Sequence, residues 1–202
     1  MALKPKLLMI GERYTCSSTD EWIDRLRLLY SYLPDYPTIA LQIRAKGRPD
    51  LLFQAASLLP SHPRLIVNTA LSDARDKGWN PIHLPESELS AASIDRVFGA
   101  SIHSQESLDK GRNLGAQYLL YGPVFAPLSK DSHPVGLEAL RKICAQSTVP
   151  ILAVGGITPQ KTVSVLQNGA YGVASAGWIM RSRSPKDEIN RFVSILTRKS
   201  AD

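Results

Sequence analysis

The stretch VPILAVGGITP, residues 149–159, combines an apolar run, a glycine pair and the start of a helix. The run has the length and the apolar character of a strand that is buried on both faces. Gly155 and Gly156 follow it directly. Thr158 then places a capping residue before Pro159, which suits the first helical position. This stretch predicts a strand, a glycine turn and a helix in immediate succession.

The same unit recurs along the chain. Short apolar runs alternate with longer segments of helical periodicity, at an average spacing of about 25 residues. The predicted strands are Lys6–Ile10, Thr38–Arg44, Leu65–Asn68, Pro81–Leu84, Val97–Ser101, Tyr118–Gly122, Pro150–Val154 and Gly172–Ser175. The alternation predicts a parallel sheet, and eight repeats favour one (β/α)8 TIM barrel domain spanning residues 1–202. An open doubly wound sheet is the alternative, but no GxGxxG pattern follows the first strand.

The composition is that of an ordinary globular protein. Hydrophobic residues make up 44% of the chain and charged residues 21%. No apolar run approaches the roughly 20 residues of a membrane helix, so we expect neither disorder nor membrane insertion. Cys16 and Cys144 lack the spacing of a disulfide framework or a metal site. They predict buried thiols in a reducing cytoplasm.

The net charge of +6 has two explanations, a generally basic surface or the attraction of an anionic ligand. Nucleic acid is not expected as a partner, because no basic run is interleaved with aromatic residues and no known binding module is present. Bulk charge does not distinguish the first two explanations, so the small-anion interpretation depends on motifs.

A phosphate site is predicted at the ends of the last two strands. Gly155 and Gly156 would let backbone amides approach an anion, and the helix N-terminus adds partial positive charge. Ala176 and Gly177 would form the second wall, since phosphate sites after strands seven and eight are frequent in barrels. The alternative is that these glycines only form tight turns. The pairing of the two segments favours phosphate.

Polar residues also end the second strand. Gln42, Arg44 and Lys46 alternate, so all three face the barrel mouth if Gln42 does. Polar side chains directed into a barrel are costly unless they have partners. Arg44 could pair with a carboxylate of a neighbouring strand, whereas we expect Lys46 to bind a ligand.

Further polar residues lie at or near the ends of strands three to six, where a barrel places its active site. They are Asn68, His83, Glu86, Glu88, Ser101 and His103, followed by the segment 122–130, GPVFAPLSK. Each has an ordinary explanation as a turn, a helix cap or a core histidine, but their convergence favours an active site. The proline-rich segment 123–134 is long enough to act as a lid over it.

With these motifs the chain resembles the thiamine phosphate synthase and TenI (thiazole tautomerase) superfamily. The resemblance extends over nearly the whole chain. The matching segments, in order, are LQIRAKG, IVN, IHL, FGASIHS, GAQYLLYGPVF with a lysine soon after, VGLEALRKI, VPILAVGGITP and NGAYGVASAGWI.

The resemblance implies a transferase that joins hydroxymethylpyrimidine pyrophosphate to thiazole phosphate and releases pyrophosphate with the help of Mg²⁺. The resemblance implies that the protein acts mainly by positioning the two ligands and by stabilising the charge that develops between them. By similarity, the pyrophosphate and pyrimidine would meet Gln42, Arg44 and Lys46, and the pyrophosphate clamp would be completed by Asn68 and Lys130. The pyrimidine would also contact Ser101. The thiazole phosphate would be held by Ser129, Gly155, Gly156, Ala176 and Gly177. Lys46, Lys130 and Ser101 are the predicted catalytic residues, and His103 is a further predicted substrate contact.

Three departures from the family pattern bear on the reaction. Thr69 stands where the family has an aspartate ligand of magnesium, and Glu88 aligns with the second acidic ligand, so Glu88 is the candidate metal ligand. The lid reads Pro127-Leu128-Ser129-Lys130 instead of Thr-x-Thr-Lys. Pro123 occupies the position where the tautomerase branch often has an acid/base histidine.

Synthase activity is therefore the first expectation. A TenI-like tautomerase, another enzyme acting on a small phosphorylated metabolite, and a barrel that only binds such a metabolite are the alternatives. A homo-oligomer is possible.

Overall fold

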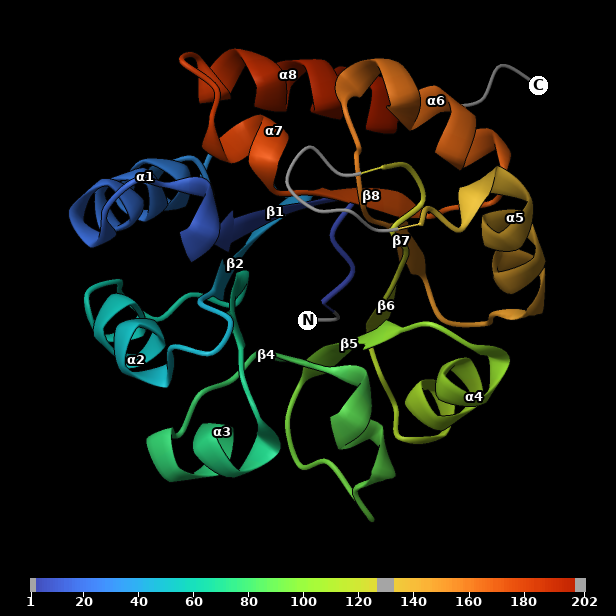
Figure 1. Cartoon of the computed structure of the whole chain (residues 1–202), viewed down its shortest axis with the longest axis horizontal. Coiled ribbons are helices and arrows are strands. Elements are labelled where there is room, and N and C mark those ends of the chain that lie inside the picture. The colour runs from blue at the N-terminus through green and yellow to red at the C-terminus, as the bar shows by residue number, and fades with distance from the viewer. Residues whose placement is uncertain (1–2, 127–132, 199–202) are drawn as a thin grey trace.

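Eight parallel strands close into a barrel in the computed structural model, and helices surround the barrel on the outside (Figure 1). The structure describes residues 3–126 and 133–198. The strands are β1 (Leu7–Glu12), β2 (Ile39–Arg44), β3 (Leu65–Asn68), β4 (Ile82–Leu84), β5 (Phe98–Ile102), β6 (Tyr118–Tyr121), β7 (Ile151–Ala153) and β8 (Gly172–Ser175). Each strand pairs with the next, and β1 pairs with β8. The predicted barrel is confirmed, and the open sheet is excluded.

The connections depart from an even repeat at two places. The helices are α1 (Thr19–Ser31), α2 (Pro49–Ser57), α3 (Leu71–Lys77), α4 (Gln105–Asn113), α5 (Gly136–Gln146), α6 (Pro159–Gln167), α7 (Gly177–Met180) and α8 (Pro185–Leu196), with short 3₁₀ helices η1 (Arg13–Thr15) and η2 (Glu86–Ser90). Only η2 stands between β4 and β5, whereas both α7 and α8 follow β8. The expectation of a longer helical segment after every strand is thus wrong for β4.

Local signals place several helix starts. Ser18 caps α1 by accepting a hydrogen bond from the backbone N–H of Glu21 at 3.1 Å. Ser104 caps α4 in a capping box with Ser107. Pro159 and Pro185 occupy the first positions of α6 and α8, where the missing N–H costs nothing.

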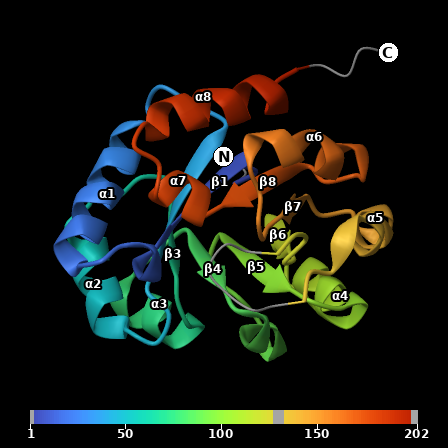
Figure 2. The ribbon, with the colours of Figure 1, turned by 45° about the horizontal axis from the view of Figure 1, so that its top comes forward.

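The core has two layers, because successive strand residues point to opposite faces. Inside the barrel, Leu8, Ile10, Ile66 and Leu120 pack together, and Leu3 closes the bottom ahead of β1. The larger layer lies between the strands and the helices seen encircling them in Figure 2. The parity of the interior layer determines which residues at the strand ends face the barrel mouth.

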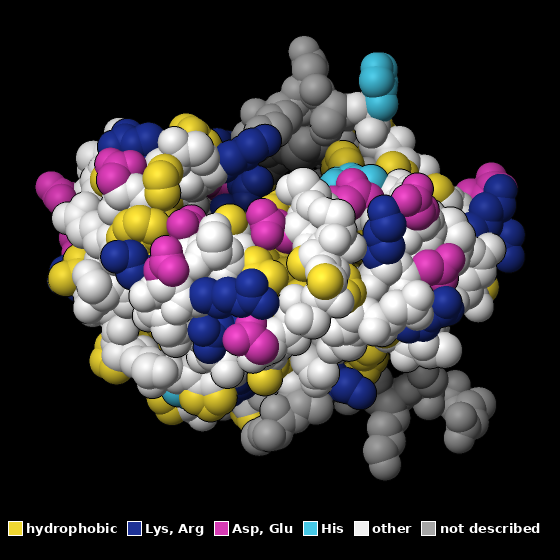
Figure 3. All heavy atoms as spheres, turned by 90° about the horizontal axis from the view of Figure 1, so that it is seen from below, with side chains coloured by type: hydrophobic (Ala, Val, Ile, Leu, Met, Phe, Trp, Pro, Cys, Tyr) yellow, Lys and Arg dark blue, Asp and Glu magenta, His cyan; other side chains and the backbone are white. Residues whose placement is uncertain are grey.

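The charged side chains form no single large patch on the face shown in Figure 3. Acidic and basic side chains are interspersed there, and the hydrophobic side chains lie in small separate patches. Within residues 3–126 and 133–198, no helix has both the length and the hydropathy of a membrane span.

Candidate active site

Arg44 and Glu12 form an ion pair at the ends of β2 and β1. The two residues are paired in the register of the strands, and Arg44 Nη1 contacts Glu12 Oε2. Both have the parity of the interior residues Leu8, Ile10 and Ala40. Burial lowers the pKa of Arg44 from its ordinary value, but a guanidinium stays charged. The pairing that the sequence left open for Arg44 is therefore present, and Glu12 is a site residue that the sequence analysis missed.

Gln42 lies one layer deeper on the same face of β2 and is only 1% exposed. Its amide oxygen is buried and has no hydrogen-bond partner among the described residues. Buried polar atoms without partners are uncommon in folded proteins and often mark functional sites. The inward placement expected for Gln42 and Arg44 is thus observed.

Lys46 lies beyond the end of β2 and is exposed. Its backbone carbonyl accepts a hydrogen bond of 2.7 Å from the Tyr14 hydroxyl, which ties the loop after β2 to η1. No carboxylate of the described residues lies within ion-pair distance of its ammonium group. The ammonium group is therefore available to an anion at the rim.

Ser101 is held by a buried hydrogen-bond chain inside the barrel. His83 Nε2 lies 2.9 Å from Ser101 Oγ, and His83 Nδ1 lies 3.1 Å from the Tyr118 hydroxyl. Gly99 makes room for this arrangement, because a Cβ there would collide with the Tyr118 ring. Burial, with a smaller contribution from the charge of Arg44, lowers the pKa of His83 to about 3. His83 is therefore neutral, and both of its ring nitrogens have hydrogen-bond partners, as expected for a histidine in the core. Its hydrogen bond also positions Ser101.

Two carboxylates meet the start of α3, close in sequence to Asn68. The hydroxyl of Thr69 lies 3.5 Å from Asp73 Oδ2, and Glu88 Oε2 accepts a hydrogen bond of 3.2 Å from the backbone N–H of Leu71. Among the described residues, no three His, Cys, Asp or Glu side chains gather as metal ligands would. Glu88, the predicted metal ligand, is therefore engaged as a helix cap, and Asp73 is a neighbouring carboxylate that the sequence analysis did not single out.

His103 follows β5 and pairs with Glu86 of η2. Glu86 accepts hydrogen bonds from the His103 backbone at 3.1 Å and contacts its Nδ1 at 2.7 Å. Burial opposes ionisation of Glu86, but hydrogen bonds from Ser107 and His103 outweigh it and hold the pKa below the ordinary value. The pair leaves His103 Nε2 free of any hydrogen bond to the described residues.

The glycine turn after β7 packs against the beginning of the predicted lid. A Cβ on Gly155 would collide with Pro123, and one on Gly156 would lie 2.6 Å from the carbonyl oxygen of Ala126. Both glycines also have positive φ, of 95° and 60°. Tight turning and close packing therefore account for the absence of side chains here. The lid residues 127–132, with the predicted contacts Ser129 and Lys130, lie outside the described residues.

The backbone amides at this part of the rim are nevertheless free. The N–H groups of Gly155, Gly156, Ala176 and Gly177 donate to no acceptor among the described residues. A Cβ on Gly177 would meet no atom within 4 Å, so this side of the rim is open. Lys161 adds a cation, since its Nζ lies 3.3 Å from the carbonyl oxygen of Gly156. Grouped free amides of this kind can bind an anion.

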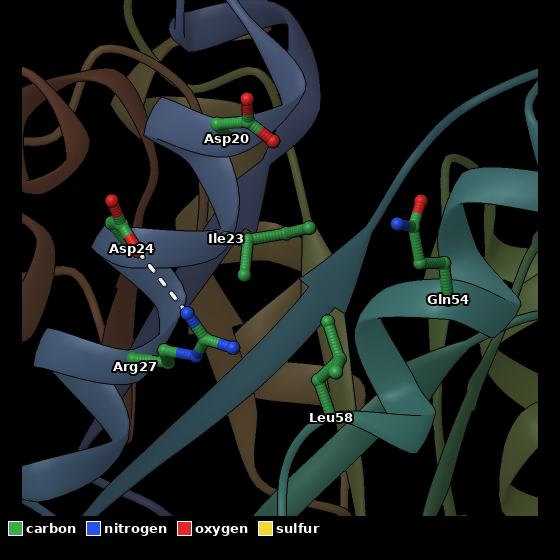
Figure 4. A pocket seen from close by; sticks show the side chains of 6 residues that line it. All are labelled: Asp20, Ile23, Asp24, Arg27, Gln54 and Leu58. Carbon is green, nitrogen blue, oxygen red and sulfur yellow. Dashed lines mark hydrogen bonds and ion pairs between the residues drawn. The ribbon is translucent and has the colours of Figure 1, made fainter.

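A surface cleft lies elsewhere, between α1 and α2 (Figure 4). Ile23 and Leu58 point into the cleft. Asp24 and Arg27, which also line it, form an ion pair at 3.3 Å. None of the residues predicted to bind substrate lines this cleft. The barrel mouth thus remains the candidate site.

The family model described as thiamine monophosphate synthase matches residues 36–179, which is more than half of the chain. The chain belongs to this family. A thiamine-phosphate synthase from Chlorobium phaeovibrioides is 32% identical over 186 residues, covering 85% of this chain and 88% of the relative. One from Synechococcus is 32% identical over 152 residues, which are 71% of this chain but only 43% of the relative.

The fold is shared with a thiamine phosphate pyrophosphorylase from Pyrococcus furiosus. The two structures superpose with a TM-score of 0.69 and 24% sequence identity, covering 96% of each chain. At this identity the likeness establishes the barrel alone. The superfamily that the motifs indicated is confirmed by the sequence matches.

In this member of the thiamine monophosphate synthase family, the predicted contacts fall into two groups at the rim. Gln42, Arg44 and Ser101 face the interior at the first group, and Lys46 and His103 are exposed near it. Gly155, Gly156, Ala176 and Gly177 form the second group after β7 and β8. Their individual roles in binding stay predictions.

Proposed function

We propose that this protein is a thiamine phosphate synthase. It would couple hydroxymethylpyrimidine pyrophosphate with thiazole phosphate and release pyrophosphate. The observation that supports this proposal is that two separate groups of hydrogen-bond donors at one barrel mouth are placed where each could bind an anion. Cationic side chains supply the first, and free backbone amides supply the second. Two anionic substrates that react with each other require such a pair.

The first arrangement suits the pyrophosphate. Arg44 offers its remaining guanidinium N–H groups, because the only contact found within the described residues uses Nη1. Lys46 adds an ammonium group that has no ion-pair partner among the described residues. Together they would stabilise the charge that develops on the departing pyrophosphate.

The second arrangement suits a single phosphate group. The four free amides after β7 and β8 would hold the phosphate of the thiazole, as the ends of these strands do in other barrels. The thiazole nitrogen would then form the new C–N bond to the pyrimidine methylene carbon as the bond from that carbon to the pyrophosphate oxygen breaks. Holding both substrates in reach removes most of the entropic cost of their encounter.

Magnesium fits this site only with help from the substrate. Mg²⁺ is commonly bound by one or two carboxylates together with substrate phosphates and water. Glu88 and Asp73 are the two carboxylates at the start of α3 that would hold it. When bound, the ion would offset the charge of the departing pyrophosphate. The rest of the reaction depends on how the chain orients the two substrates.

The His103–Glu86 pair favours a second candidate function, proton transfer on a phosphorylated thiazole. A carboxylate on Nδ1 fixes the tautomer of a histidine and leaves Nε2 to exchange a proton with a ligand. This arrangement would serve tautomerisation where the family's usual histidine is replaced by Pro123.

The cellular setting is part of the same proposal. Cys16 is buried and Cys144 is partly buried, and neither forms a disulfide. Burial raises the pKa of Cys144 to about 11, which makes its thiol unreactive. Both observations suit a cytoplasmic enzyme of small phosphorylated metabolites. A homo-oligomer stays a prediction.

The deciding experiment incubates the purified protein with both synthase substrates across a magnesium titration. Thiamine phosphate and pyrophosphate are measured together, and they should appear in equal amounts. Lys46→Ala should lower the rate, whereas Lys142→Ala, the same change on the outer helix α5, should not. Formation of neither product by the unmodified protein would refute synthase activity. The His103→Gln variant then tests the second candidate through loss of proton exchange on the thiazole.

A further inference from the structure

Glu12 has a buried oxygen that the protein itself leaves without a partner. Its side chain is 11% exposed, and Oε2 contacts Arg44. Oε1 is buried and accepts no hydrogen bond from the described residues. An ionised carboxylate oxygen in such surroundings is costly unless something donates to it. The ion pair with Arg44 therefore explains only half of this side chain.

A second unpaired acceptor lies in the same corner of the mouth. The amide oxygen of Gln42 is also buried and without a partner in the described part of the chain. Gln42 stands two residues before Arg44 on the inward face of β2, and Arg44 is register-paired with Glu12. The corner between β1 and β2 thus presents two buried acceptors that no described residue satisfies, beside the guanidinium of Arg44.

The surroundings limit what kind of donor could fit. Arg44 on the other oxygen of Glu12 disfavours a divalent cation through like-charge repulsion. Ile10 and Leu120 belong to the interior apolar layer, and the strand register places them level with Gln42 and Ser101. An apolar ring with N–H groups on its edge would cover these side chains and satisfy the acceptors.

We propose that Glu12 determines specificity by accepting a hydrogen bond from an amino-substituted nitrogen heterocycle. Its Oε1 reads an N–H group of the ring, while its Oε2 holds Arg44 beside the anionic group of the same ligand. The proposal rests on the proposed function, because the pyrimidine of the first substrate is such a ring. It adds a recognition residue on β1 that none of the family-matching segments contains.

The charge of Glu12 predicts opposite effects on the two parts of the ligand. Removing the carboxylate takes away the acceptor for the ring. It also removes a negative charge beside Arg44, which favours the binding of an anion. A purely structural role would instead weaken both kinds of binding together with the fold.

The experiment measures dissociation constants for three probes by calorimetry. They are 4-amino-5-hydroxymethyl-2-methylpyrimidine, the same ring without the 4-amino group, and inorganic pyrophosphate. The unmodified protein should bind the amino ring at least tenfold more tightly than the ring without the amine. Glu12→Gln should reduce that preference at least fivefold and leave pyrophosphate binding unchanged or tighter, because a neutral acceptor is weaker than a charged one. Glu106→Gln, an identical change on the exposed face of α4, should alter neither.

Three results would overturn the proposal. They are equal binding of both rings by the unmodified protein, an unchanged preference in Glu12→Gln, and a parallel loss of ring and pyrophosphate binding. If Glu12→Gln fails to fold, Glu12→Asp replaces it, and the same loss of preference is required from the shortened acceptor. All probes are read by binding, so a protein that prefers the amino ring but forms no thiamine phosphate would refute the synthase proposal alone.

Discussion

The first five strands and the last three strands contribute to the barrel mouth in different ways. The ends of β1 to β5 carry paired polar side chains, among them the Glu12–Arg44 ion pair and the His83–Ser101 hydrogen bond. After β7 and β8, the glycine and alanine residues instead present backbone N–H groups that donate to no acceptor in the described part of the chain. Side chains can be exchanged without changing the barrel, whereas free amides depend on the path of the backbone. We therefore expect changes in the first part to alter affinity and rate, and changes in the second part to alter folding as well.

The largest effect is expected at Gly155. Alanine there must adopt a positive φ and collide with Pro123, so the free energy of unfolding should fall by about 3 kcal/mol. Gly115→Ala is the matched control, since Gly115 also has positive φ but nothing within 4 Å of the added Cβ. It should lose only about 1 kcal/mol in urea unfolding. Equal losses in the two variants would show that packing against the lid base contributes nothing.

Thr69→Asp should raise the magnesium-dependent activity of the side-chain group at the ends of the first five strands. A third carboxylate beside Asp73 and Glu88 would restore a magnesium ligand, and one such contact is worth a few kcal/mol, roughly a hundredfold in rate. The rate of pyrophosphate release across a magnesium titration measures it. Thr148→Asp, an exposed position before β7, controls for added charge. Strong magnesium-dependent turnover of the unmodified protein would show that Thr69 is no handicap.

His83 should make stability depend on pH. Its pKa is about 3 when folded, against an ordinary value of 6.5, so the unfolded chain takes up a proton that the folded chain refuses. Stability from this source is complete above about pH 6.5 and is lost as pH falls toward 3, by about 1.4 kcal/mol per pH unit. Urea unfolding at pH 7 and pH 5 should show a steeper loss for the unmodified protein than for His83→Gln. Identical slopes would contradict a neutral buried histidine.

Lys46→Ala should have the smallest effect on the fold and a clear one on the ligand. The side chain is exposed and its backbone contact with Tyr14 survives the change, so the melting temperature should move by no more than a few degrees. Affinity for pyrophosphate should fall about tenfold, as expected for one lost charged contact. A large drop in melting temperature with unchanged affinity would make Lys46 a structural residue.

Much of the barrel could be predicted because each strand carries its own signal. The bounds of β3 and β8 agree with prediction, since apolar runs between turn residues mark them on both sides. The end of β1 was placed two residues early, at Ile10, because Gly11 and Glu12 do not look like a strand. That error concealed Glu12, whose inward direction follows once β1 is extended to it, because Glu12 shares the parity of Leu8 and Ile10.

The sequence by itself determined the eight strands, the family, and most of the positions that face the barrel mouth. These follow from local periodicity and from motifs that are contiguous in the chain. Only the tertiary structure decided which partner each group finds. It joined Glu12 to Arg44, His83 to Ser101, and Glu88 to the start of α3, and each pair comes from two different elements of the chain. Hydrogen bonds and burial depend on distances between segments, and closure of the barrel sets those distances.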